Sequence, residues 1–392
     1  MALGSAIAYN FVDLAFLGDP IEDMSMRIQA KGQAFPKTMK AVVTIGQGGF
    51  EQLQYKDILM PSIRPGEVLI KVLAAGINNT DINTRIGWYS NSLKASTHNL
   101  TQSQSRGEKK YLEDGGWNNP TPFPLIQGTD CCGLVVAVGQ TKHQALVGKR
   151  VIVRPCQRTK GFESYEQSWM ASDFDGAFAE YTKVPASEVF PVTSNWSDEE
   201  LASIPCAYGT AENMLIRSKL KKAMRVLVCG ASGGVGSATI QLAKLRSAEV
   251  LAVTNATKAE AVRSIGADKI IDRELPLDSQ IEEESIDLVL DNVGGQNFPF
   301  LLKALKRGET YISSGAIAGP QVGLDLRDLY LKDLQLLGST AWDAQVFPNL
   351  VKYIEENQIR PCIAKVFSLK DIVNAQEEFL KKNHIGKIVL KI

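Results

Sequence analysis

The sequence has few of the residues that build metal sites, and neither sign of charge is in excess. Only three of the 392 residues are histidine, and the six cysteines form no C-x-x-C pair and no cluster with histidine. This pattern argues against a structural zinc site or a disulfide framework and favours reduced thiols in a cytoplasmic protein. The 43 basic and 43 acidic side chains balance, which gives no electrostatic reason to expect nucleic acid or an anionic membrane as a partner. No apolar run approaches the roughly 20 residues that a membrane-spanning helix requires.

The first 38 residues are the least informative part of the chain, and we treat residues 1–38 as an N-terminal extension. No basic residue precedes Arg27, which argues against a secretory signal. Met24, Met26 and Met39 are each candidate start positions, and a packed N-terminal arm is the alternative. The remaining length suggests two or three domains.

A glycine-rich turn between a strand and a helix is the most informative motif. Arg225 to Cys229 is a short apolar run typical of a buried parallel strand, and apolar residues follow at helical spacing from Ser237 to Lys244. The turn between them reads Ala231-Ser-Gly233-Gly-Val-Gly236, a G-x-G-x-x-G fingerprint with alanine in the first place. In such a turn Gly233 lets the backbone approach a pyrophosphate, and Gly236 lets the helix pack closely on the strand. With a second strand at the right distance, the motif predicts a dinucleotide-binding unit rather than a bare structural turn.

The end of that second predicted strand, residues 249–254, normally selects the cofactor. A carboxylate about 20 residues beyond the fingerprint would bind the ribose 2′-OH of NAD, but this chain has Thr254-Asn-Ala-Thr-Lys258 there. A 2′-phosphate would instead meet Asn255, Lys258 and, further on, Arg273. The sequence therefore predicts NADP(H). The alternative is that Lys258 is a solvated residue in the first turn of the next helix.

Two patterns of secondary structure divide the rest of the chain. From Met39, short β runs are separated by Gly and Pro turns as far as residue 184. After a helix cap at Ser197-Asp-Glu-Glu, strands and helices alternate, which predicts a parallel sheet with helices on both faces. Helices at 347–357 and 369–383 and a strand at 386–391 complete the pattern. The predicted fold is α/β, with a β-rich domain (residues 39–192 and 345–392) and a doubly wound parallel-sheet Rossmann domain (residues 193–344).

Two polar stretches interrupt the β-rich part, at about residues 90–119 and 157–173. The first contains clusters of Ser, Thr, Asn and Gln and the run Arg106-Gly-Glu-Lys-Lys. Loops this long in a compact domain tend to be lids, interface arms or mobile segments. The alternative is that both are solvated loops without a role, and the motifs give no reason to prefer either.

The layout resembles the medium-chain dehydrogenase/reductase superfamily over about residues 39–392, and most closely its zinc-independent quinone oxidoreductase and enoyl-reductase branch. The resemblance implies a GroES-like β-rich catalytic domain beside the Rossmann domain. It rests on the fingerprint and on the segments Gly76-Ile-Asn-Asn-Thr-Asp81, Gln127-Gly-Thr-Asp130, Pro205-Cys-Ala-Tyr-Gly-Thr-Ala211, Asp291-Asn-Val-Gly-Gly295 and Gly386-Lys-Ile-Val389.

The resemblance also implies that no catalytic zinc is bound. Zinc-dependent members have Cys, His and Cys at the positions of Asn78, Thr129 and Cys206. A tetrahedral catalytic zinc needs three protein ligands and an open position, and one thiol beside an amide and a hydroxyl does not supply them. Without a Lewis acid, alcohol oxidation is disfavoured, and hydride delivery to a quinone or to an α,β-unsaturated carbonyl compound is the expected chemistry.

The resemblance assigns expected roles to further residues. Asn78 and Asp81 would line the cleft shared by substrate and nicotinamide, and Arg85 and Tyr89 would replace a tyrosine that many quinone reductases have at the position of Asn83. The cofactor would be bound by Thr210, Gly233, Gly234, Val235, Gly236, Asn255, Lys258, Arg273, Asn292 and Gly315.

Two rival functions and the oligomeric state stay open at this point. The rivals are a zinc-dependent alcohol dehydrogenase-like enzyme and a low-turnover NADPH-binding sensor, the latter suggested by the lack of an identifiable proton donor. The substrate is a small molecule that the motifs do not name. Relatives are commonly dimers joined at the edge of the Rossmann sheet, and the apolar run Leu334-Gln-Leu-Leu-Gly338 would permit a homodimer.

Overall fold

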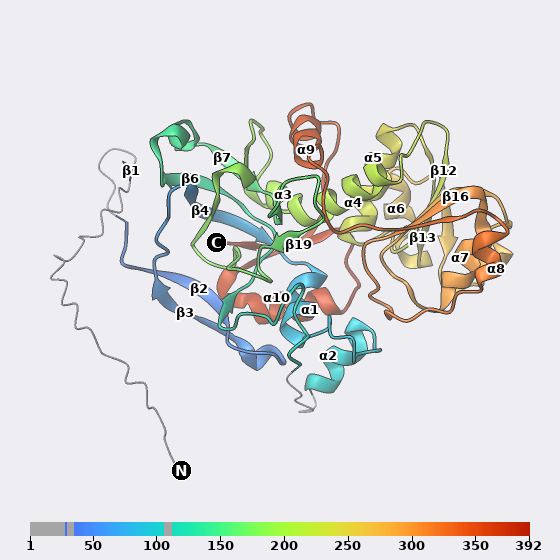
Figure 1. Cartoon of the computed structure of the whole chain (residues 1–392), viewed down its shortest axis with the longest axis horizontal. Coiled ribbons are helices and arrows are strands. Elements are labelled where there is room, and N and C mark those ends of the chain that lie inside the picture. Colours follow the sequence, from blue (N-terminus) through green and yellow to red (C-terminus); the bar gives the residue numbers. More distant parts are fainter. Residues whose placement is uncertain (1–27, 30–34, 106–111) are drawn as a thin grey trace, which may run out of the picture.

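The computed structural model describes residues 28–29, 35–105 and 112–392. A mixed sheet and a parallel sheet lie side by side, with helices α4 (Pro205–Arg217) and α9 (Val346–Glu355) near their junction (Figure 1). Most of the predicted N-terminal extension and the run Arg106–Lys110 lie outside the described residues. None of the described helices is long and apolar enough to cross a membrane.

The mixed sheet combines the N-terminal part of the chain with its last strand. The strand order is β11-β7-β6-β4-β19-β18, and β10 and β1 pair with β4 and β6. The last strand returns as predicted, because Val389 lies antiparallel to Gly76. The bounds are β1 (Ile28–Gln29), β4 (Glu67–Gly76), β6 (Cys132–Val138), β7 (Arg150–Val153), β10 (Tyr181–Pro185), β11 (Val189–Pro191), β18 (Ile363–Ser368) and β19 (Lys387–Lys391). A smaller sheet has the order β3-β2-β5, with bounds β2 (Thr38–Thr44), β3 (Leu53–Leu59) and β5 (Leu125–Ile126).

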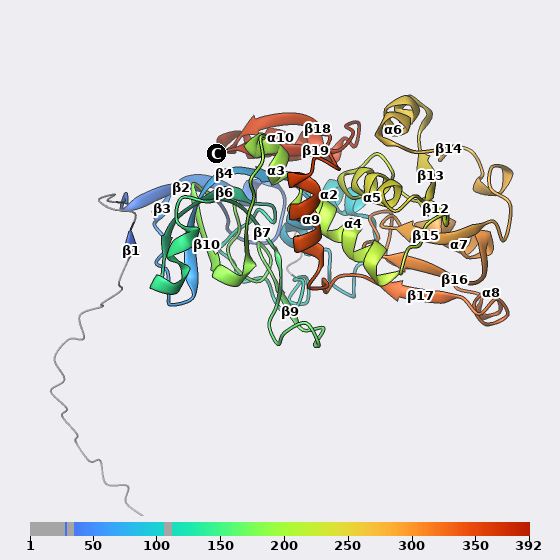
Figure 2. The same ribbon diagram turned by 90° about the horizontal axis from the view of Figure 1, so that it is seen from above.

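The parallel sheet has the doubly wound order β14-β13-β12-β15-β16-β17. Side chains of the central strand β12 (Arg225–Val228) alternate between two cores: Val226 and Val228 pack with helices α4 and α5, and Leu227 packs with α7 on the other face. Figure 2 shows helices on both faces of this sheet. The other bounds are α5 (Gly234–Leu245), β13 (Glu249–Thr254), α6 (Ala259–Ile265), β14 (Lys269–Asp272), β15 (Ile286–Asp291), α7 (Phe298–Ala304), β16 (Leu305–Ser313), α8 (Leu326–Tyr330) and β17 (Gln335–Gly338).

The first polar stretch is not the structureless loop that its composition suggested. It contains helix α2 (Thr97–Ser105), whose sequence is almost entirely polar and therefore has no apolar periodicity to reveal it. The second contains an antiparallel pair, β8 (Cys156–Arg158) and β9 (Gln167–Trp169). Both segments are too short and polar for sequence periodicity, and tertiary contacts decide their structure.

Three further helices frame the region between the sheets. They are α1 (Asn79–Ile86), α3 (Asp198–Ala202) and α10 (Ile372–Leu380). The predicted cap of α3 is confirmed: the Ser197 hydroxyl accepts from the Glu200 amide, and the Glu200 carboxylate accepts from the Ser197 amide. Short 3-10 turns occupy 50–52, 141–146, 186–188, 256–258, 277–279, 295–297 and 369–371.

Candidate functional site

Two cavities meet at the glycine-rich turn, where β12 lies between β13 and β15 and the strand order reverses direction. Open α/β sheets bind ligands at such a switch point, outside the carboxyl ends of the strands. We call them the tryptophan-lined cavity and the lysine-lined cavity, after Trp88, Trp117, Trp169 and Trp342 in one and Lys258 and Lys382 in the other. Their shared lining is Asn79, Gly230, Gly233, Gly234, Ile317 and Phe379.

The glycines of the turn have two different structural roles. Helix α5 begins at Gly234, and a Cβ on Gly233 would have no atom nearer than Gly230 O at 3.5 Å. The N-terminal amides of α5 therefore face the open space where the cavities meet, which suits phosphate oxygens. A Cβ on Gly236, in contrast, would overlap the Gly230 carbonyl and the Ala231 backbone. Gly236 packs the helix on the strand and lines neither cavity.

The lysine-lined cavity gathers the cations predicted for the cofactor. Lys258 and Arg273 both line it. The Lys258 ammonium donates to the Lys382 carbonyl (2.6 Å) and the His384 carbonyl (3.0 Å). Burial, helped by Arg273, lowers the pKa of Lys258. Asn255 does not line this cavity, and its Oδ1 accepts from the Thr257 hydroxyl at 3.0 Å.

Lys382 is a third cation of this cavity, and sequence reasoning missed it. Its ammonium donates to Asn79 Oδ1 (2.9 Å) and lies 3.7 Å from the centre of the Phe379 ring. Burial, with a smaller contribution from Lys258, lowers the pKa of Lys382 to about 7. Its sequence neighbour His384 also lines the cavity, where burial lowers the pKa of the imidazole to about 4. The basic pair Lys381-Lys382 before the last strand was the available signal.

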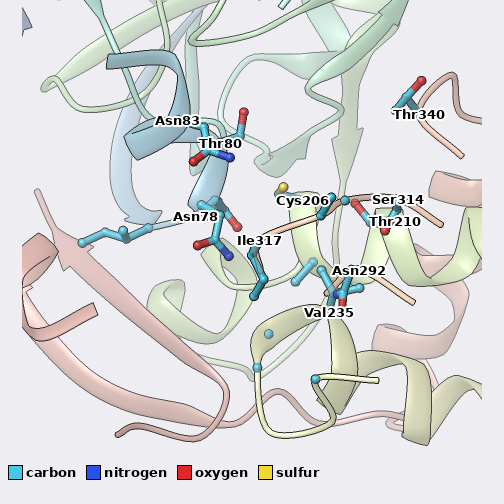
Figure 3. A pocket seen from close by; sticks show the side chains of 18 of the residues that line it. Asn78, Thr80, Asn83, Cys206, Thr210, Val235, Asn292, Ser314, Ile317 and Thr340 are labelled. Carbon is cyan, nitrogen blue, oxygen red and sulfur yellow. The ribbon is translucent and has the colours of Figure 1, made fainter. Parts of the chain in front are cut away.

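The tryptophan-lined cavity receives polar groups from both parts of the molecule (Figure 3). Asn78, Thr80 and Asn83 come from the start of α1, and Thr210, Asn292 and Ser314 come from the Rossmann side. The Tyr89 hydroxyl donates to Thr80 Oγ1 at 3.1 Å, and burial raises the pKa of Tyr89 well above its usual value. Eight predicted site residues thus line one cavity, namely Asn78, Tyr89, Thr210, Gly233, Gly234, Val235, Asn292 and Gly315.

Asp81 lies behind the cavity rather than in its lining, contrary to the prediction. Its carboxylate accepts from the Asn78 amide (2.8 Å) and from the backbone amides of Gly128 (3.3 Å) and Thr129 (3.2 Å). Burial raises the pKa of this carboxyl to about 6, against the opposing effect of the Asn78 amide. Asp81 therefore caps the first turn of α1 and connects it by hydrogen bonds to the loop before β6.

Arg85 is also turned away from the cavity and is not a candidate donor to a bound molecule. Its side chain is fully buried and donates to the Gly48 carbonyl (2.8 Å) and to Gln376 Oε1 (2.7 Å). The guanidinium also lies over the Phe50 ring, and burial lowers its pKa to about 10. Arg85 thus joins α1 to α10.

A buried ion pair lies at the base of the tryptophan-lined cavity. Lys387, at the start of β19, donates to Asp130 Oδ2 (2.8 Å), Asn78 Oδ1 (2.5 Å) and the Ile77 carbonyl (2.9 Å). Asn78 donates through Nδ2 to the same Asp130 oxygen (2.9 Å), and the Cys206 amide donates to Asp130 Oδ1 (2.6 Å). Both charged side chains are almost completely buried. The sequence motifs contained Asp130 and Lys387, but nothing in the sequence showed that they meet.

The side chains at this base do not fit a zinc ion. Lys387 places a positive charge beside Asn78, and the Thr129 hydroxyl is hydrogen-bonded to Asp81 Oδ1. Of the three positions, Cys206 alone has a side chain that commonly binds zinc. Within the described residues, no three His, Cys, Asp or Glu side chains are grouped as a metal site would need.

The chain is similar to known oxidoreductases along almost its whole length. The family model "Alcohol dehydrogenase GroES-like domain" matches residues 64–194, and "Zinc-binding dehydrogenase" matches residues 234–356. A solved structure from Sinorhizobium meliloti, provisionally described as an alcohol dehydrogenase, is 40% identical, with 91% of this chain and 97% of that chain covered and a TM-score of 0.80.

Two curated relatives are reductases. An acryloyl-coenzyme A reductase from Metallosphaera sedula is 28% identical, with 90% of this chain and 99% of the relative covered. An NADPH-dependent alkenal/one oxidoreductase from Arabidopsis thaliana is 28% identical over 91% of this chain and 80% of its own length. The predicted α/β fold with GroES-like and Rossmann parts is confirmed, and the chain belongs to the medium-chain dehydrogenase/reductase superfamily.

Proposed function

We propose that this chain is an NADPH-dependent reductase that transfers hydride to a quinone or an α,β-unsaturated carbonyl compound without zinc. The observation that carries the proposal is the group of three cations, Lys258, Arg273 and Lys382, in the cavity beside the glycine turn. A phosphate-bearing cofactor explains why they gather where an NAD-specific chain would have a carboxylate.

Different residues of the chain bind the cofactor and the acceptor in this proposal. When bound, NADPH supplies the hydride. The amides at the start of α5 hold its phosphates, and Thr210, Asn292 and Gly315 line the adjoining wall of the tryptophan-lined cavity. Neither Asn255 nor Gly236 lines either cavity. Gly236 packs α5 on β12, and Asn255 hydrogen-bonds within the turn at 256–258 that precedes α6.

The acceptor needs a hydrogen-bond donor for the negative charge that develops on its carbonyl oxygen. Asn78 does not suit this role, because its Nδ2 already donates to Asp130 Oδ2 (2.9 Å) and to the Gly76 carbonyl (3.4 Å). Thr80 suits it better: its oxygen accepts from Tyr89, which leaves the Thr80 hydroxyl proton to donate into the cavity. The high pKa of Tyr89 makes it a poor acid, so we assign the proton added to carbon to solvent.

A zinc-dependent alcohol dehydrogenase is the rival that one of the two matching family models suggests by name. The donor set around Lys387 is the physical argument against it. Stoichiometric zinc in the purified protein, measured by elemental analysis, would overturn zinc independence.

A homodimer joined at β17 is proposed for the same chain. The apolar side chains of Leu326, Tyr330, Leu331 and Leu336 are exposed on and beside this edge strand. The mass in solution tests it. A cytoplasmic location stays a prediction.

The cofactor proposal is tested by Lys258→Ala. We expect this variant to weaken NADPH binding by at least about tenfold, because a charge-assisted contact is lost, and to change NADH binding by less than about twofold. Fluorescence titration with both nucleotides measures the ratio. Equal losses of affinity for NADPH and NADH would contradict NADP selectivity.

A second experiment separates an enzyme from a low-turnover sensor. NADPH oxidation is measured with a panel of quinones, enones and enals, and a sensor would bind NADPH tightly but reduce none of them.

A further inference from the structure

An uninterrupted row of aromatic rings crosses the tryptophan-lined cavity. Ring centroids are 4.6 Å apart between Tyr89 and Trp117, 5.0 Å between Trp117 and Trp169, and 5.3 Å between Trp169 and Trp342. All four rings line the cavity. Spacings of this size are those of interacting aromatic pairs, so the row forms one continuous wall.

The two polar stretches supply the middle of this wall. Trp117 belongs to the first stretch, and Trp169 belongs to strand β9 in the second. The ends come from Tyr89, just after α1, and from Trp342, just after β17. Four segments far apart in the sequence therefore meet at one surface, and the stretches that the family motifs do not cover shape the acceptor side of the cavity.

The wall is buried at one end and partly exposed at the other. Trp169 is 4% exposed and Trp342 is 1% exposed. The Trp169 indole donates to Gln167 Oε1 (3.1 Å), and Arg158 donates to the Trp342 backbone carbonyl (2.7 Å). Trp117 and Tyr89 are only half-buried and line the cavity, so part of each side chain is available to a bound molecule. The Trp117 ring packs against the buried Trp169 ring.

The cavity offers a bound molecule little electrostatic attraction. Among the described residues that line it, Lys387 alone carries a charge. Its three protons are already donated to Asp130, Asn78 and Ile77. A ligand carrying carboxylate or phosphate inside this cavity would lose hydration without gaining a cation.

We propose that the acceptor is a flat, uncharged conjugated carbonyl compound bearing an aromatic ring, and that Trp117 determines this specificity by stacking on that ring. The inference rests on the proposed function. In an aryl enone, hydride from NADPH forms the new C–H bond at the β-carbon, and the C=C π electrons pass through the enolate. A proton from solvent completes the α-carbon, so that the C=C bond is reduced and NADPH leaves as NADP⁺.

A matched pair of acceptors tests the inference. The compound trans-4-phenyl-3-buten-2-one differs from 3-penten-2-one only in a phenyl group at the site of a methyl group. We expect the full-length protein to favour the phenyl compound in kcat/KM by at least about 100-fold, because ring burial and stacking both contribute. Trp117→Leu is expected to lower this preference about tenfold, chiefly by raising KM for the phenyl compound. Trp117→Phe is expected to restore most of it.

Tyr165→Leu is the control, because Tyr165 lies on the same polar stretch as Trp169 but is 74% exposed. It should leave the preference unchanged, and all variants should bind NADPH with unchanged affinity if they are folded. Similar kcat/KM values for the two acceptors in the unaltered protein would overturn the aromatic specificity while leaving the reductase function intact. An equal loss for both acceptors in Trp117→Leu would refute the role of Trp117. NADPH binding without reduction of either compound, but with reduction of quinones or enals from the wider panel, would overturn this inference alone. NADPH binding without reduction of any compound in the panel would reject the reductase function and this inference with it.

Discussion

The proposed nucleotide side of the cleft, formed by the glycine turn and the lysine-lined cavity, and the proposed acceptor side, formed by the tryptophan-lined cavity, are built in different ways. The centre of the nucleotide side is local: β12, the glycine turn and α5 follow one another in the chain, and the amides that we propose for the phosphates belong to a single helix start. The acceptor side is assembled from distant segments, with Lys387 bonded to Asp130 across 257 positions and to Asn78 across 309. A motif is therefore enough to locate the proposed phosphate site, whereas Lys382 and the whole of the proposed acceptor site become visible only in the tertiary structure.

The comparison predicts that the most damaging single change lies on the assembled side. Lys387→Met removes the ammonium that is paired with Asp130, whose side chain is fully buried. We expect a loss of about 3–5 kcal/mol in the free energy of unfolding, because the buried carboxylate keeps its hydrogen bonds from Asn78 and Cys206 but loses the positive charge that balances it. Urea unfolding monitored by circular dichroism measures it.

The matched control is the double variant Asp130→Asn with Lys387→Met, which removes both charges. It should recover most of the lost stability, because neither charge then remains buried alone. A second control, Lys160→Met, breaks a pair whose side chains are both more than half exposed and should have little effect. A Lys387→Met variant as stable as the parent would show that the assembled side does not depend on this pair.

Two glycines of the same turn are expected to respond differently when each is replaced by alanine. Gly236→Ala should lower the free energy of unfolding by about 1–3 kcal/mol, because the added methyl group overlaps backbone atoms of Gly230 and Ala231. Gly233→Ala should leave stability within about 0.5 kcal/mol, since its Cβ meets only Gly230 O at 3.5 Å. It should nevertheless weaken NADPH binding, because the methyl group faces the phosphates. Thermal unfolding measures the effect on stability, and titration with NADPH measures the effect on binding. A larger loss of stability in Gly233→Ala than in Gly236→Ala would contradict the roles assigned to these two glycines.

The last prediction concerns the pH dependence of NADPH binding, which we attribute to Lys382. Lys382 has its pKa lowered to about 7 by burial and by Lys258. A bound phosphate favours the charged ammonium, so NADPH binding takes up a proton above this pKa. NADPH affinity should therefore fall as pH rises from 7 to 9, by at most about tenfold per pH unit. Calorimetry in buffers of different ionisation enthalpy measures the proton uptake. Lys382→Met should lose this dependence, and a variant that keeps it would assign the titration to another group.

The structure also shows where sequence reasoning placed side chains wrongly. The resemblance implies that Asp81 lines the cleft and that Arg85 replaces a missing tyrosine donor. In the structure both lie on the buried face of α1, where Asp81 bonds the loop before β6 and Arg85 reaches α10. Spacing along one helix does not reveal which face is inward, because that depends on partners such as Gln376, which is 291 positions away.

The Rossmann unit, the return of the last strand to the mixed sheet and most of the residues around the glycine turn could be predicted from the sequence. Strand periodicity, glycine spacing and helix caps are local, so they can be recognised without knowing the fold. Three features became visible only in the folded chain: the contacts of Lys387 with Asp130 and Asn78, the place of Lys382 in the lysine-lined cavity, and the wall that contains Trp117 and Trp169. These contacts join residues from separate segments, and their energies depend on burial and mutual distance, which no stretch of sequence contains.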